Sequence, residues 1–140
     1  MHFFRHVLLM LAISIIFTTS PIMADQSHDK STVFQLFSDM ETAWNTQDSD
    51  TYITFFHDDL KLKLGKKNKP EYYSKTKYAK VLPERMKHFG PFKMVDPKIL
   101  KMDGDSAKAS VVVRKIKRDY KNVFNLVWED GKWQILSNEW

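Results

Sequence analysis

Residues 92 to 140 constrain the fold most, because they form four successive segments in which apolar and polar side chains alternate. The segments are 92–101, 105–117, 120–128 and 132–140. Two of the intervening turns, MDGD and EDGK, contain an Asp-Gly pair between alternating runs, the strongest short-range signal for a β-hairpin. The pattern therefore predicts an antiparallel meander of four strands at the end of the chain.

Both faces of this meander carry apolar side chains. In residues 120–128, Phe124, Leu126 and Trp128 fall on one face, while Val123 and Val127 fall on the other. A sheet that is apolar on both faces has to be covered twice, and one set of helices covers a single face. We therefore expect a homodimer that forms through the second face of the sheet.

The region before the meander predicts the helices that cover the first face. Residues 33–44 place apolar side chains at helical spacing, with Asp29 or Ser31 as the N-cap. After the break TQDSD, residues 49–56 predict a second, short helix, and DLKLKLG alternates as a strand does.

A third helical pattern runs from Ser74 to about Phe89. Pro83 lies inside it, and because proline has no N–H we expect a kink or two short helices there. The stretch KKNKPEYYSK before it predicts a turn or loop.

The N-terminus predicts export. The run VLLMLAISIIF followed by TTSPIMA is typical of a secretory signal peptide, residues 1–24, cleaved near Ala24. A retained membrane anchor is the alternative, but the run is shorter than the ~20 residues of a spanning helix. Residues 25–140 then form a single domain in the periplasm or outside the cell, and without any Cys they rely on their core alone.

The middle of the chain is strongly basic. Residues 60–121 hold nineteen Lys and Arg against six acids, and Lys61 to Lys80 includes three tyrosines, Tyr72, Tyr73 and Tyr78. Lysines among aromatic rings suit an anionic partner such as an envelope lipid or polysaccharide. The alternative is ordinary solubilising surface, and export makes nucleic acid an unlikely partner.

The order helix, helix, strand, helix and four antiparallel strands, together with AWNTQDSDTYITFFHDD and DGKWQI, resembles the nuclear-transport-factor-2-like (NTF2-like) superfamily. This superfamily includes ketosteroid isomerases and SnoaL-like polyketide cyclases. The resemblance covers residues 31–140 and implies an α+β, cone-shaped, cystatin-like fold with N-terminal helices packed on a curved antiparallel sheet.

The resemblance also implies a pocket inside the cone. Its wall would comprise the apolar side chains of the helices and the sheet, namely Met40, Trp44, Phe56, Leu62, Leu64, Met86, Phe89, Phe124 and Leu126. The alternative is that these side chains simply meet and fill the cone, as side chains do in most protein interiors.

The ketosteroid-isomerase resemblance does not carry over its catalytic groups. Leu64 occupies the position of the catalytic carboxylate, Met40 that of the helix-1 Tyr, and residues 120–128 contain no acid. The remaining candidates are His57 with Asp59, and His88, although adjacent residues tend to point apart. The His residues have no metal-ligand spacing and no phosphate-binding loop appears, so we expect neither a metal nor a cofactor.

Two functions remain open on the sequence. The first is a secreted non-catalytic domain that binds a small apolar ligand or a protein partner. The second is a small cyclase- or dehydratase-type enzyme that uses His88, or His57 with Asp59, together with Tyr52 or Tyr78. A His and a carboxylate within hydrogen-bonding reach inside a cavity would favour the enzyme.

Overall fold

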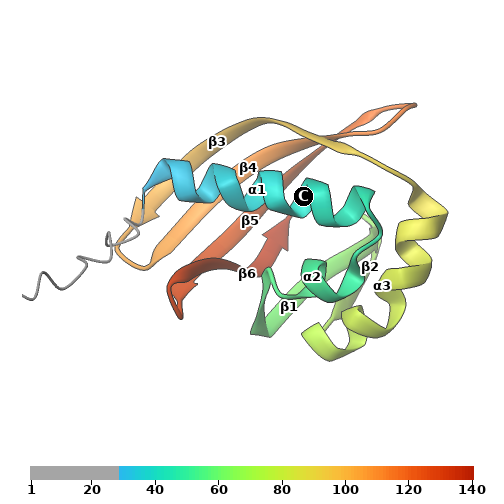
Figure 1. Cartoon of the computed structure of the whole chain (residues 1–140), viewed down its shortest axis with the longest axis horizontal. Coiled ribbons are helices and arrows are strands. Elements are labelled where there is room, and N and C mark those ends of the chain that lie inside the picture. Colours follow the sequence, from blue (N-terminus) through green and yellow to red (C-terminus); the bar gives the residue numbers. More distant parts are fainter. Residues whose placement is uncertain (1–28) are drawn as a thin grey trace, which may run out of the picture.

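Figure 1 shows a computed structural model that describes residues 29–140. In these residues three helices cover one face of a six-stranded sheet: α1 (Lys30–Asn45), α2 (Ser49–Ile53) and α3 (Lys75–Phe89). The predicted signal peptide lies outside the described residues. Within residues 29–140 no helix is long and apolar enough to cross a membrane.

The sheet confirms the predicted meander and adds two strands to it. Its strands are β1 (Phe56–Lys66), β2 (Lys69–Tyr73), β3 (Lys93–Asp103), β4 (Ser106–Arg114), β5 (Asp119–Glu129) and β6 (Lys132–Glu139), in the order β2-β1-β6-β5-β4-β3. Strands β3 to β6 are antiparallel neighbours, whereas β1 runs parallel to β6. The α+β fold with helices on a curved sheet is confirmed, and the sheet is mixed at this single pair.

One local prediction was wrong, and one of the two alternatives at Pro83 is excluded. Residues 69–73, predicted as a loop, form β2, because the chain turns at residues 67–68 and folds back on β1 in an antiparallel hairpin that pairs Lys66 with Lys69. Helix α3 is continuous and has Pro83 inside it, so the two-helix alternative does not hold. Both Pro83 and Ala79, whose carbonyl would have bonded to residue 83, lie on the solvent side of α3, where water can satisfy that carbonyl.

Helix starts agree with the expected caps. The Asp29 carboxylate accepts a hydrogen bond from the Thr32 N–H at 3.1 Å, and the Ser74 hydroxyl accepts one from the Lys77 N–H at 3.2 Å. Each bond satisfies a backbone donor that has no partner within its helix. The registers of α1 and α3, and hence the faces they bury, are set by these caps.

The core lies between the helices and the inner face of the sheet. Helix α1 buries a single apolar stripe, and the sheet opposes it with side chains from β4, β5 and β6. The buried members are Val33, Leu36, Phe37, Met40, Ala43 and Trp44 on α1, and Ala107, Ala109, Val111, Val113, Phe124, Leu126, Trp133 and Ile135 on the sheet. Burial of these side chains is the main favourable term in folding.

The C-terminal end of α1 is tied to residues 90–94 by three polar side chains. The Trp44 indole N–H donates to the Gly90 carbonyl at 2.8 Å, and Glu41 accepts from the Met94 N–H at 3.0 Å. Between them, the Asn45 amide donates to the Phe92 carbonyl at 2.8 Å and accepts from its N–H at 3.0 Å. These bonds fix the position of α1 against the start of β3.

We predict that Asn45→Ala lowers the free energy of unfolding by about 2 kcal/mol, because it leaves both part-buried backbone groups of Phe92 without partners. Urea unfolding followed by circular dichroism measures this loss. Gln35→Ala, which removes an exposed hydrogen bond on the same helix, is the control and should change stability by less than about 0.5 kcal/mol. Equal effects of the two variants would show that the amide does not hold α1 in place.

Candidate functional site

An inner cavity of about 130 Å³ lies between the helices and the inner face of the sheet. Most of its wall is aromatic or aliphatic, and four polar residues complete it. The lining residues are Trp44, Tyr52, Phe56, Leu62, Leu64, Tyr78, Phe89, Phe92, Met94, Val113 and Phe124, with Arg85, Lys115, Asn122 and Asn138. Such a wall suits a ligand with an apolar body.

The aromatic part of the wall is a chain of rings in contact. The ring centroid of Trp44 lies 5.3 Å from that of Tyr52 and 5.0 Å from that of Phe92, and Phe56 lies 5.3 Å from both Tyr52 and Tyr78. The ring planes are tilted or perpendicular, as the quadrupoles of aromatic rings favour. Rings from α1, α2, β1 and α3 therefore hold one another in place around the cavity.

The inner cavity opens into a larger outer cavity of about 670 Å³. The two share six lining residues, which are Leu64, Arg85, Phe89, Val113, Lys115 and Asn122. The outer cavity adds Gly65, Lys67, Arg118, Tyr120, Lys121 and Trp140. A molecule in the inner cavity would therefore reach solvent past Arg85 and Lys115.

The lining is cationic. It includes Lys67, Arg85, Lys115, Arg118 and Lys121, and among residues 29–140 neither lining contains an Asp, Glu or His. Burial lowers the pKa of Lys115, and repulsion by Arg85 and Arg118 adds to this, while Tyr120 opposes it. The cavity thus keeps positive charges close together without a carboxylate beside them.

Two buried tyrosines form the floor between α2 and α3. Burial raises the pKa of Tyr78 to about 12, although interactions with Arg85 and Tyr52 partly oppose the shift. Burial, together with Tyr78, also raises the pKa of Tyr52 well above its usual range. Both hydroxyls are therefore neutral at physiological pH, and neither can serve there as a proton acceptor in the way an ionised base does.

The structure brings six of the nine predicted wall residues to the inner cavity: Trp44, Phe56, Leu62, Leu64, Phe89 and Phe124. Met40, Met86 and Leu126 are instead enclosed in the packed core, with 0%, 1% and 2% of their surface exposed. The role of all nine as ligand contacts stays a prediction.

Sequence reasoning missed the polar residues of the wall. Arg85 is seven positions after the buried Tyr78 on α3, and Asn122 is two positions before the buried Phe124 on β5, so the helical and strand periods place both on inward faces. Lys115 is two positions after the buried Val113, so the strand period places it on the same face, just beyond the end of β4.

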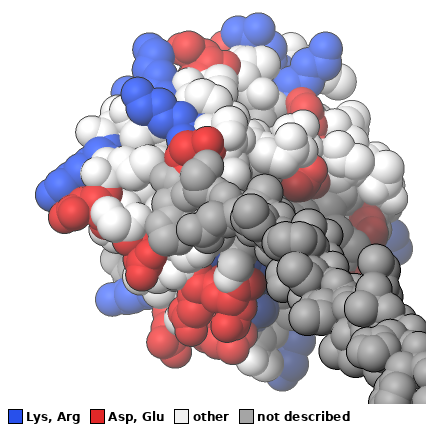
Figure 2. Space-filling view, turned by 60° about the vertical axis from the view of Figure 1, so that its left-hand side comes forward, with Lys and Arg blue, Asp and Glu red and all other residues white. Residues whose placement is uncertain are grey.

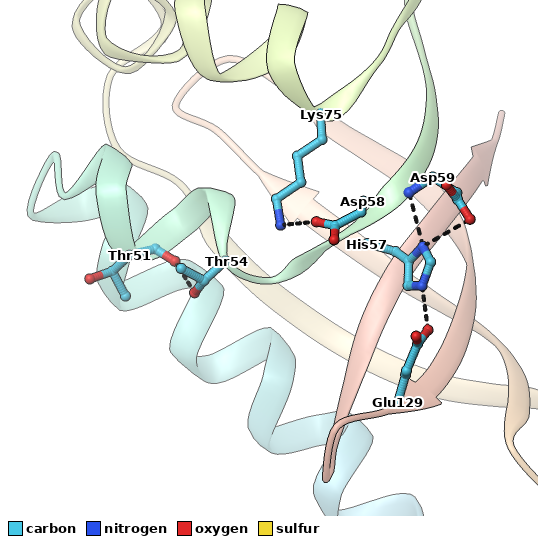
Figure 3. A network of polar contacts seen from close by, with 7 residues as sticks. All are labelled: Thr51, Thr54, His57, Asp58, Asp59, Lys75 and Glu129. Atoms are coloured by element: carbon cyan, nitrogen blue, oxygen red, sulfur yellow. Dashed lines mark hydrogen bonds and ion pairs between the residues drawn. The ribbon is translucent and has the colours of Figure 1, made fainter.

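His57 does meet a carboxylate, but outside both cavities (Figure 3). Its Nε2 contacts Glu129 of β5, while its Nδ1 accepts a hydrogen bond from the Asp59 N–H at 3.0 Å and lies 3.9 Å from the Asp59 carboxylate. Asp59 and Glu129 are exposed, with 87% and 52% of their side-chain surface accessible. This cluster links the start of β1 to the β5–β6 hairpin.

His88 also lies outside both cavity linings. It is exposed in the last turn of α3, and its ring stacks edge-on against Phe89 at 4.8 Å. The predicted enzyme, which needs a His and a carboxylate together in a cavity, therefore lacks that pair at these positions. Within residues 29–140 no three His, Asp or Glu side chains are grouped as metal ligands.

The Lys61–Lys80 segment spreads over β1, β2 and α3. Lys61 lies over the Tyr72 ring and Lys77 over the Tyr73 ring, at 5.0 and 4.2 Å from the ring centroids. Tyr78, expected among the surface rings, is 4% exposed and belongs to the cavity wall instead. Binding of an anionic envelope surface by this segment stays a prediction.

We predict that the buried Tyr78 makes stability depend on alkaline pH. In the unfolded chain Tyr78 ionises near pH 10, whereas in the folded protein its pKa is about 12, so its contribution is complete below about pH 10 and is lost as the pH rises to about 12. The free energy of unfolding of the wild type should fall by about 2 kcal/mol more than that of Tyr78→Phe between pH 9 and about pH 11.5.

Urea unfolding at a series of pH values measures this difference. Tyr72→Phe, at a ring that is 52% exposed, is the matched control and should follow the wild type. Parallel curves for the wild type and Tyr78→Phe would contradict the buried position of this hydroxyl.

The comparisons with known proteins agree with this geometry. The family model described as “Putative lumazine-binding” matches residues 28–140. No curated protein matches the chain. Among solved structures, an NTF2-like protein of unknown function from Pseudomonas putida KT2440 has a TM-score of 0.64 at 19% identity, covering 79% of this chain and 83% of that one.

Two further solved structures illustrate the range of proteins with this fold. A protein of unknown function with a cystatin-like fold from Nostoc punctiforme PCC 73102 has a TM-score of 0.63 at 15% identity, covering 79% of this chain and 87% of its own. A protein from Novosphingobium aromaticivorans DSM 12444, described as “Putative Scytalone Dehydratase”, has a TM-score of 0.56 at 15% identity, covering 78% and 80%.

These identities show the NTF2-like fold and no more, since this fold carries many unrelated functions. The family match, in contrast, extends from the start of α1 to the last residue of the chain. The protein therefore belongs to the family described as “Putative lumazine-binding”.

Proposed function

We propose that the protein is a non-catalytic binding domain that holds a small ligand with an apolar ring system in the inner cavity. The observation that carries this proposal is the aromatic wall of the inner cavity, in which the side chains contact one another. The inner cavity opens to solvent through the outer cavity. The family description, which names lumazine binding, points in the same direction.

The dimensions favour a ligand that extends from one cavity into the other. Binding sites for small molecules commonly measure roughly 300–1,000 Å³. The inner cavity, at about 130 Å³, is smaller than this range, and the outer cavity, at about 670 Å³, lies within it. A ligand would therefore place its apolar end among the rings and leave its other end beside Leu64 and Val113.

Catalysis of the cyclase or dehydratase type is the alternative. The solved structure described as a dehydratase is the observation that supports it. Such reactions need a side chain that takes up or releases a proton near neutral pH. The ionisable groups in the two linings are Lys, Arg and tyrosines, without a carboxylate or an imidazole; burial raises the pKa values of Tyr52 and Tyr78 and lowers that of Lys115. This chemistry favours binding over catalysis.

We predict that the uncharged fluorescent probe N-phenylnaphthylamine binds the wild type and that Leu64→Trp weakens its binding by at least about tenfold, because the larger ring fills the junction of the two cavities. Ile116→Trp adds the same ring at a site that is 96% exposed and should leave the affinity unchanged. Fluorescence titration measures both. Equal affinities of Leu64→Trp and the wild type would place the probe outside the cavity.

We also propose that the outer face of the sheet forms a homodimer. Val95, Val112, Val123 and Val127 share this face, and each is only partly buried within one chain. The helices cover the opposite face, so the dimer would bury these side chains.

Sedimentation velocity at tens of micromolar protein tests the dimer. We expect the wild type to be a dimer and Val123→Lys to be a monomer, because burying an unpaired charge in the interface is costly. Lys108→Arg keeps the charge on the same face and is the control. A monomeric wild type would reject the homodimer.

We propose further that the domain acts in the periplasm or outside the cell, which the sequence of residues 1–24 supports.

A further inference from the structure

We propose that the ligand carries an anionic group, and that Arg85 and Lys115 hold this group where the inner cavity opens into the outer one. The inference deepens the proposed function and rests on it, because it concerns the same cavity. It assigns the ligand to a chemical class, organic anions with an apolar ring system.

One nitrogen of the Arg85 guanidinium lacks a hydrogen-bond partner. Arg85 is half-buried on α3, it lines both cavities, and its Nε is the single buried side-chain nitrogen or oxygen among residues 29–140 that has no hydrogen-bond partner. A buried polar atom without a partner costs free energy, and more so when its group is charged. An anionic ligand group beside Arg85 would offset this cost, because it would pair with the guanidinium charge.

Lys115 converges on the same place from the other side of the cavity. Its Nζ lies 4.5 Å from the centroid of the Phe89 ring, and the Arg85 guanidinium lies 4.8 Å from the same centroid. Two cations around one ring repel each other, and the lowered pKa of Lys115 agrees with that repulsion and with its burial. An anion between them would turn this repulsion into attraction and would also restore the solvation lost on burial.

The neighbouring residue shows what a paired cation looks like in this region. The guanidinium of Arg114, which precedes Lys115, donates two hydrogen bonds of 3.1 Å to the carboxylate of Asp119. None of the five cavity cations has such a carboxylate among the described residues. The positive charges of the cavity are therefore not neutralised by a carboxylate, while the nearby Asp119 is paired with Arg114.

The charge distribution over the molecule would draw an anion toward this mouth. The β3–β4 and β5–β6 turns, at the opposite end of the sheet, expose Asp103, Asp105, Glu129 and Asp130. Figure 2 shows the face of that side of the molecule, where Asp and Glu side chains lie among Lys and Arg and form one larger group at the bottom of the view. Lys67, Arg118 and Lys121 line the outer cavity at the other end, so the field steers anions inward.

A matched pair of probes tests this proposal. Anilinonaphthalene sulfonate and N-phenylnaphthylamine share one aromatic framework and differ by a sulfonate group. In fluorescence titrations at low salt, we expect the wild type to bind the sulfonate at least about tenfold more tightly. Raising the salt to about 1 M should reduce this preference, because ions screen the charges.

Substitutions then locate the anion. Arg85→Gln and Lys115→Gln should each weaken binding of the sulfonate at least about fivefold and change binding of the uncharged probe less than about twofold. Lys80→Gln, which removes an exposed charge from the same helix outside both cavities, is the control and should change neither affinity. Thermal unfolding of each variant shows that it is folded, and Arg85→Lys, which keeps the charge, should retain part of the preference.

The outcomes separate the two proposals. If the uncharged probe does not bind, or binds equally to Leu64→Trp, the proposed function fails. If it binds in the cavity but the sulfonate is not preferred, the function stands and the anion site is overturned. An equal loss of both probes in folded Arg85→Gln would also overturn it, because Arg85 would then shape the wall rather than recognise charge.

Discussion

The attachment of α1 to residues 90–94 is the constraint on which the cavity depends. Trp44 contributes to both, because its indole N–H bonds to the Gly90 carbonyl while its ring packs against Tyr52 and Phe92 in the wall. If α1 moved toward the sheet, its rings would fill the cone as an ordinary core. The hydrogen bonds of Glu41, Trp44 and Asn45 hold it where the rings meet in tilted or edge-on contacts and leave space beside them.

The same construction explains why the interior divides into a dry part and a charged part. Close to α1 and β6 the side chains of Met40, Leu126 and Ile135 are almost fully enclosed. Toward the β4–β5 turn, Arg85 and Lys115 lie along Phe89, and both are half-buried. Long cationic side chains commonly pack their stems on apolar surface in this way. The gradient from rings to cations is what selects a ligand with one apolar and one anionic end.

Much of the fold could be predicted from the sequence, since its strongest signals are local. The Asp-Gly turns fixed two hairpins, and Asp29 and Ser74 marked the helix starts that the structure shows. The parallel pairing of β1 with β6 could not be predicted in this way, because it joins residues far apart in the sequence. Strand β2 was missed because Lys69–Tyr73 is short, polar and exposed, without an alternating apolar face.

The candidate site was predictable only in its apolar part. The resemblance to the NTF2-like superfamily implied a wall that includes Trp44, Phe56 and Leu64, but it did not distinguish them from Met40 and Met86, which are packed in the core. The cations were missed for a different reason: Lys115 continues the alternation of Val111 and Val113, but the charge of a lysine indicates an exposed position. Binding of an anionic surface by Lys61–Lys80 stays a prediction; that segment contributes Lys67 to the cavity, and the other cavity cations lie on α3 and around the β4–β5 turn.

The central claim is that a ligand anion meets Arg85 inside the cavity, and the NMR signal of the Arg85 Nε–H reports this contact most directly. In ¹⁵N spectra assigned with Arg85→Gln, titration with anilinonaphthalene sulfonate should shift the Nε–H signal, because the sulfonate binds the guanidinium to which this N–H belongs. The Nε–H of Arg114, already bonded to Asp119, should not move. Saturation of the protein with the sulfonate and no change at Arg85 would contradict the account.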